Sequence, residues 1–166
     1  MLGRIEKDAE ELESLTTGLL SLARLESGQA HFERRRLQLD ELVASVVTYA
    51  DFESAARGRH VRLSAEPVAV EADAVLLRSA VENVVRNAVR HTPEQSGVVV
   101  SVSRVGGRVA LVSVHDAGPG LAPGELEAVF DPVARVGESR SRDSGGFGLG
   151  LAIARRALQL HGGSIS

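Results

Sequence analysis

Two asparagines four residues apart are the first side chains in this sequence whose spacing could support chemistry. The segment "ENVVRNAVRHT" places Asn83 and Asn87 on one face of a helix, with Arg90 and His91 one turn further on. Amide groups on an otherwise apolar helix are costly to bury unless they make hydrogen bonds or bind a cation. A ligand or a metal ion could therefore bind to them. A polar helix face in contact with water explains this segment equally simply, and both interpretations stay open at this point.

A glycine-rich stretch near the end of the chain could bind phosphate. The segment "SGGFGLGLAIARRALQLHGG" runs from Ser144 to Gly163 and joins closely spaced glycines to an apolar pattern of helical period. Glycines let the main chain approach a phosphate, and a helix N-terminus supplies free N–H groups with a partial positive charge. A P-loop is excluded because Gly150 is followed by Leu151 instead of Lys and Ser or Thr. A dinucleotide-binding turn is disfavoured because no strand pattern precedes the glycines.

A third candidate is the segment "HDAGPG", which closes an apolar alternation with Asp116 and continues through Gly118 and Gly120. A carboxylate at this place could accept hydrogen bonds from an exocyclic amine, while the glycines would let a flat ring approach the main chain. The same letters also make a good turn, so this segment is weak evidence when taken alone.

A long amphipathic helix is predicted before these segments, from Arg4 to Glu26. At 1.5 Å per residue it would be roughly 35 Å long, too long and too exposed to stand alone. No partner helix occurs before the globular pattern begins, so the apolar stripe is expected to pair with a second chain or with a helix outside this chain. The polar segment "SGQAHFERRR" follows as a linker.

The rest of the chain predicts alternating helices and short strands. Asp40 is a plausible N-cap for a helix from Glu41 to about Arg57, and Asp73 for a second helix. Strands are expected at "RLQL", "HVRLSA" and "VAVEA", with a hairpin formed by "GVVVSVSRV" and "RVALVSVHD". A last helix runs from about Leu149 to His161, and "GGSIS" begins another strand. This order predicts a two-layer α+β sandwich.

Composition narrows the function classes. The chain has 166 residues, a formal net charge of -3 and no cysteine. These values argue against a general nucleic-acid binder and exclude disulfides and thiolate metal sites. No apolar run approaches the roughly 20 residues needed to span a bilayer, and no signal peptide pattern opens the sequence.

Taken in order, "ENVVRNAVRH", "DAGPG", "VFDPVARV" and "GGFGLGLAIA" resemble the N, G1, F and G2 boxes of the bacterial sensor histidine kinases, the envelope-stress sensors among them. The resemblance implies the Bergerat ATP-binding fold with a mostly antiparallel sheet, preceded by a helix of a dimeric bundle. It divides the chain into the second helix of the dimerisation and phosphotransfer domain (1–28), a linker (29–36) and a catalytic domain (37–166). The resemblance also implies that the C-terminal strands of that domain are truncated and that its ATP lid covers about 117–148.

The resemblance also implies roles for individual residues. Asn83 and Asn87 would position Mg²⁺ and phosphate oxygens, Arg90 would contact phosphate, and His91 would lie beside the nucleotide. Asp116 would bind the adenine amine, which favours ATP over GTP, and Arg135 would reach the γ-phosphate from the lid. The remaining implied nucleotide contacts are Gly118, Gly120, Phe130, Arg140, Arg142, Gly146, Phe147, Gly148, Leu149 and Gly150.

Two departures from the family pattern matter. The F box here ends in Val133, where the family has a second aromatic residue, so Phe130 would hold the lid more loosely. The phosphoacceptor histidine with its characteristic following residues is absent, and the remaining histidines are expected to be structural or exposed to solvent: His31, His60, His115 and His161.

Other activities of the same fold stay as alternatives. Hydrolytic ATPases such as gyrase and MutL, and serine kinases, place a glutamate general base where this sequence has Asn83, and Glu82 points about 100° away. This favours transfer to an imidazole, although a non-catalytic nucleotide-binding dimerisation module stays possible for this chain. The implied partners are ATP, an acceptor-histidine helix, a response regulator and a second copy of the chain, without nucleic acid. The implied location is the cytoplasmic side of a membrane-anchored sensor.

Overall fold

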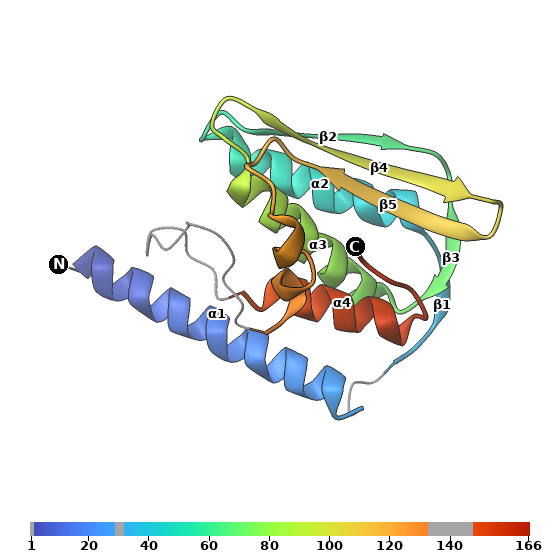
Figure 1. Cartoon of the computed structure of the whole chain (residues 1–166), viewed down its shortest axis with the longest axis horizontal. Helices are drawn as coiled ribbons and strands as arrows, with labels where there is room; N and C mark the ends of the chain where they lie inside the picture. The colour runs from blue at the N-terminus through green and yellow to red at the C-terminus, as the bar shows by residue number, and fades with distance from the viewer. Residues whose placement is uncertain (1, 29–31, 133–147) are drawn as a thin grey trace. The chain divides into compact units, whose positions relative to one another are not determined.

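The structure, a computed structural model, describes residues 2–28, 32–132 and 148–166 (Figure 1). Its contacts group the chain into two compact units. One unit is Phe32–Gly120, and the other combines Met1–His31 with Leu121–Ser166.

The unit Phe32–Gly120 is a layer of helices on a layer of strands. Its elements are β1 (Arg35–Gln38), α2 (Leu39–Ala55), β2 (His60–Ala65), β3 (Ala69–Ala72), α3 (Ala74–His91), β4 (Gly97–Val105) and β5 (Val109–His115). Strands β2, β4 and β5 form one sheet in the order β2-β4-β5, and β1 pairs with β3 in a small antiparallel sheet. Helices α2 and α3 cover one face of the larger sheet (Figure 1). The predicted α+β two-layer sandwich is therefore confirmed.

The larger sheet mixes two kinds of pairing. Strands β4 and β5 form the predicted antiparallel hairpin, with Val100 opposite Val114. Strand β2 pairs with β4 in parallel, with Val61 opposite Val98, although the two strands lie far apart in sequence. Alternate residues of β4 are buried under the helices, as period-two patterning requires: Val98, Val100 and Val102.

The predicted cap of α3 is confirmed. Asp73 is 7% exposed, and its Oδ1 accepts hydrogen bonds from the main-chain N–H groups of Val75 and Leu76, both at 3.0 Å. Its Oδ2 accepts a third hydrogen bond from the N–H of Glu33 at 3.0 Å. The first turn of the helix that carries Asn83 is therefore fixed by a buried carboxylate.

The predicted cap of α2 is wrong. The helix begins at Leu39, so Asp40 lies inside the first turn, and its Oδ1 accepts a hydrogen bond from the N–H of Val68 at 3.1 Å. The N–H of Leu39 donates to the carbonyl of Val68 at 2.8 Å. Because the segment before β3 satisfies the start of the helix, no side-chain cap is required there.

The second unit contains α1 (Leu2–Glu26), the short 3-10 helices η1 (Pro123–Glu125) and η2 (Ala128–Phe130), and α4 (Gly150–Leu160). The predicted long first helix is confirmed, and part of it packs against α4. A Cβ atom at Gly18 would lie 3.1 Å from the Cδ1 of Leu149, and Arg156 Nε donates to the carbonyl of Leu25 at 3.3 Å. The same chain therefore supplies a partner for this helix, which the sequence patterning did not reveal.

The apolar stripe of α1 is only partly covered. Leu22 and Leu25 are buried, whereas Leu12, Leu19 and Leu20 are between 49% and 64% exposed. The last helix, expected from about Leu149 to His161, is observed as Gly150–Leu160, and residues 163–166 lie in no strand, contrary to expectation. In the part of the chain that the structure describes, no helix is long and apolar enough to cross a membrane.

Candidate nucleotide-binding site

The two asparagines of α3 lie on one half-buried face of the helix. Asn83 donates a hydrogen bond from Nδ2 to the carbonyl of Ser79 at 2.9 Å, which leaves its Oδ1 as the atom able to bind a ligand. Asn87 makes no side-chain hydrogen bond to any described residue. The described residues contain no cluster of three or more His, Cys, Asp or Glu that could hold a metal ion. A cation at these amide oxygens would therefore need further oxygen ligands from a bound molecule or from water.

Asp116 lies directly after β5 with its carboxylate held in one orientation. Its Oδ1 accepts a hydrogen bond from the main-chain N–H of Gly118 at 2.7 Å. A Cβ atom at Gly118 would lie only 2.6 Å from this Oδ1 and 3.0 Å from the carbonyl oxygen of His91. No hydrogen bond to the other carboxylate oxygen comes from the described residues. Glycine at position 118 therefore brings Asp116 close to the end of α3 and leaves one oxygen available.

His91 and Arg90 occupy the last turn of α3, where positive charge is favourable. Burial lowers the pKa of His91, and the charge of Arg90 lowers it further, while Asp116 acts in the opposite direction. These two effects favour the neutral form of the imidazole. Arg90 is half-buried, whereas a large part of the His91 residue is exposed.

Gly120 and Gly148 have φ values of +71°, in the left-handed region that favours glycine. Gly148 precedes Leu149, which is 5% exposed and forms the N-cap of α4 without any side-chain cap hydrogen bond. The first main-chain N–H groups of α4 therefore receive no hydrogen bond from the side chain of the N-cap residue.

Phe130 ends η2 and contacts α4 within the same unit. The guanidinium carbon of Arg155 lies 5.5 Å from the centre of the Phe130 ring, and Arg155 Nη2 lies 3.4 Å from Glu127 Oε2. Phe130 is half-buried at this contact.

Five of the predicted site residues lie outside the described residues: Arg135, Arg140, Arg142, Gly146 and Phe147.

Sequence reasoning missed Thr92, the residue that follows α3. Its side chain is 1% exposed, and its hydroxyl accepts a hydrogen bond from the N–H of Ala117, next to Asp116. The sequence signal for Thr92 was a threonine between the polar end of a helix and Pro93, but a residue in this position usually only ends the helix.

A surface groove of about 580 Å³ elsewhere in this unit is lined by residues of β1, α2, β3 and α3 and by none of the predicted site residues.

The family model of histidine kinase-, DNA gyrase B- and HSP90-like ATPases matches residues 72–166, more than half of the chain. Sensor histidine kinase CpxA of Escherichia coli K12 is 35% identical over 164 residues, which cover 98% of this chain and 35% of CpxA. Sensor protein CutS of Streptomyces coelicolor is 34% identical over 157 residues, covering 95% and 37%. The chain thus spans about a third of the length of these relatives.

Solved structures agree with the sequence relatives. Full-length ShkA in complex with AMPPNP superposes with a TM-score of 0.82 at 26% identity, covering 96% of this chain and 33% of ShkA. The mycobacterial sensor histidine kinase MprB gives a TM-score of 0.68 at 26% identity, covering 78% and 80%.

The fold, the family model and the similar solved structures together define an ATP-binding domain of the α+β sandwich class. The chain belongs to the family of histidine kinase-, DNA gyrase B- and HSP90-like ATPases, and its domain is of the sensor histidine kinase kind.

Proposed function

We propose that this chain binds Mg-ATP and transfers the γ-phosphoryl group to a histidine on a helix outside the chain, for relay to an aspartate of a response regulator. The observation that carries the proposal is the fixed carboxylate of Asp116 beside the end of α3, in a domain of this family. The nucleotide analogue bound by ShkA, a relative in structure, supports the same ligand class here.

Asp116 is the proposed adenine-binding residue. Its Oδ1 is occupied by the N–H of Gly118, so the second oxygen is the acceptor for the exocyclic amine of adenine. Guanine has a carbonyl oxygen at that position and would bring two acceptors together, which costs affinity in a partly buried site. This arrangement therefore favours ATP over GTP.

Asn83 and Asn87 are the proposed magnesium and phosphate ligands on α3. Amide oxygens are hard ligands of the kind Mg²⁺ accepts, and the Asn83 amide is already oriented by Ser79. When bound, Mg²⁺ would neutralise charge on the phosphates. The N-terminus of α4 after Gly148 has no side-chain cap and is proposed as a further phosphate-binding group. Arg90, in the other unit, is proposed separately as a phosphate contact because its guanidinium keeps its charge.

The position of Asn83 favours phosphoryl transfer over hydrolysis. Hydrolytic members of the fold need a carboxylate base there, and an amide cannot take up the proton of a water molecule. The neighbouring Glu82 lies 3.8 Å from Arg78 Nη1, one turn earlier on the helix. An imidazole acceptor is nucleophilic when neutral, so it needs no carboxylate at position 83.

The parent protein is proposed to be a membrane-anchored sensor that dimerises through the bundle containing α1. The exposed leucines of α1 support this, because an uncovered apolar stripe on a long helix favours association. Sedimentation of the chain as a monomer at every concentration tested would argue against self-association through this helix.

The central test has two parts. Calorimetric titration with a non-hydrolysable ATP analogue should detect magnesium-dependent binding to the wild type, and Asp116→Asn should weaken it about 10- to 100-fold, since a charge-assisted hydrogen bond is lost. Incubation with radiolabelled Mg-ATP and a separate, intact acceptor domain should then label a histidine of that domain. Binding without labelling would remove the kinase proposal and leave a nucleotide-binding module.

A further inference from the structure

The side chain of Thr92 is a buried polar group near the proposed adenine site. Thr92 is 1% exposed, and its Oγ1 accepts a hydrogen bond from the N–H of Ala117 at 3.1 Å. Strand β5 ends at His115, so its ladder offers no partner to the N–H of Ala117. The threonine therefore satisfies a main-chain donor that the sheet leaves without one.

The second contact of this hydroxyl has a defined direction. Ser96 Oγ donates its only proton to the carbonyl of Pro93 at 2.6 Å. The 3.3 Å contact between Thr92 Oγ1 and Ser96 Oγ must therefore be donated by Thr92. Thr92 thus accepts one hydrogen bond and donates another, and an isosteric valine would remove the acceptor of the Ala117 N–H and the donor to Ser96 Oγ.

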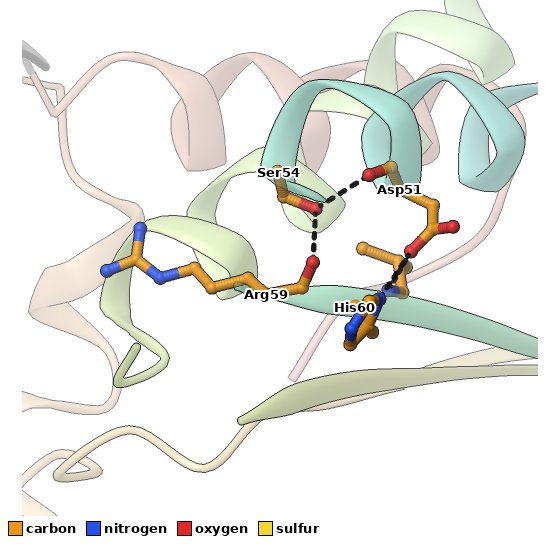
Figure 2. Close-up of polar contacts among 5 residues, drawn as sticks. Asp51, Ser54, Arg59 and His60 are labelled. Carbon is orange, nitrogen blue, oxygen red and sulfur yellow. Dashed lines mark hydrogen bonds and ion pairs between the residues drawn. The ribbon is translucent and has the colours of Figure 1, made fainter. Parts of the chain in front are cut away.

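Ser96 in turn connects Thr92 to the beginning of β2. The N–H of His60 donates to the carbonyl of Ser96 at 3.3 Å. Figure 2 shows how the turn before His60 is held: the Ser54 hydroxyl lies 3.2 Å from the carbonyl oxygens of both Asp51 and Arg59. Ser54 is 4% exposed, so this anchor is part of the packed interior.

Thr92 therefore joins an anchored turn to the segment that carries Asp116. Ala117 stands between Asp116 and Gly118, and the N–H of Gly118 orients the carboxylate. With the N–H of Ala117 fixed from one side and that of Gly118 bonded to the carboxylate, the main chain has little freedom to turn Asp116 away.

We propose that Thr92 is a positioning residue for adenine recognition, acting through Ala117 to hold Asp116 in its ligand-accepting orientation. This inference rests on the proposed function, because it assigns Thr92 a part in the same site. Thr92 is not proposed to contact the nucleotide itself. The effect of replacing it should therefore appear only for ligands that bind to Asp116.

The test compares Thr92→Val with Thr92→Ser by calorimetric titration. One ligand is a non-hydrolysable ATP analogue, and the other is purine riboside triphosphate, which lacks the exocyclic amine. We expect Thr92→Val to weaken the ATP analogue about tenfold and purine riboside triphosphate less than about twofold. Thr92→Ser keeps the hydroxyl and should stay within about twofold of the wild type for both ligands.

Equal losses for the two ligands in Thr92→Val, or no loss for either, would overturn the inference while leaving nucleotide binding intact. A wild type that binds neither ligand would overturn the proposed function and this inference with it. If Thr92→Val fails to fold, amide hydrogen exchange in the wild type tests the contact between Thr92 and Ala117 instead. The amide proton of Ala117 should be protected, and rapid exchange at that position would refute the contact on which the inference depends.

Discussion

The main-chain N–H of Gly118 donates a 2.7 Å hydrogen bond to the carboxylate of Asp116, two residues earlier. This short loop orients an acidic side chain beside the C-terminal end of α3, and it requires that position 118 carry no side chain. The proposed adenine contact depends on this relationship, because it sets the direction of the Asp116 carboxylate.

Gly118→Ala should weaken binding of the ATP analogue at least about tenfold, because the new methyl group would lie 2.6 Å from Asp116 Oδ1 and displace the carboxylate. Gly124→Ala is the matched control, since a Cβ atom there meets nothing within 4 Å. Calorimetric titration of both variants measures the effect. Equal affinities in the two variants would contradict the assigned role of the loop.

Asp73→Ala should lower the free energy of unfolding by about 2 kcal/mol, since it removes a buried cap that accepts three main-chain hydrogen bonds. Asp131→Ala removes an exposed aspartate and should change stability by less than about 0.5 kcal/mol. Urea unfolding followed by circular dichroism gives both values. A stable Asp73→Ala protein would mean that α3 is held by its packing alone.

His91 should make the protein less stable as the pH falls through about 6.5. Its pKa is lowered in the folded protein, chiefly by burial, so the unfolded chain takes up a proton at a higher pH than the folded chain. The unfolded state therefore binds more protons in this window, and stability decreases with decreasing pH. Thermal unfolding should show a smaller loss between about pH 7.5 and 5.5 in His91→Gln than in the wild type.

The difference in pH dependence between these two proteins should disappear above about pH 8, where histidine is neutral in both states. A His91→Gln variant whose melting temperature falls as steeply as that of the wild type would show that other groups cause the acid sensitivity.

Gly18→Val should loosen the packing of α1 on α4. Its Cβ atom would lie 3.1 Å from Leu149 Cδ1, and the branches of valine would need more room than this contact leaves. Thr17→Val places the same side chain at the neighbouring, exposed position of α1. We expect faster hydrogen exchange in α4 for Gly18→Val alone, and similar exchange in the two variants would refute a tight contact at Gly18.

Local patterns in the sequence were enough to predict most of the elements. The period-two alternation of "GVVVSVSRV" predicted β4 with its observed bounds, Gly97–Val105. The Asp73 cap was also predictable, because an aspartate before an apolar helical pattern satisfies N–H groups within its own neighbourhood. Asp40 gave the same local signal and was misleading, because its carboxylate bonds to the distant N–H of Val68.

The sequence by itself determined the helices, the hairpin, and the order of the polar and glycine-rich segments, since each depends on residues a few positions apart. Only the tertiary structure decided which distant segments meet. The parallel pairing of β2 with β4, the packing of α1 on α4 and the hydrogen bond from Ala117 to Thr92 all join residues that are remote in sequence. Such contacts form because buried polar groups require hydrogen-bond partners and apolar faces are stabilised by burial. Both become possible only when the chain is folded.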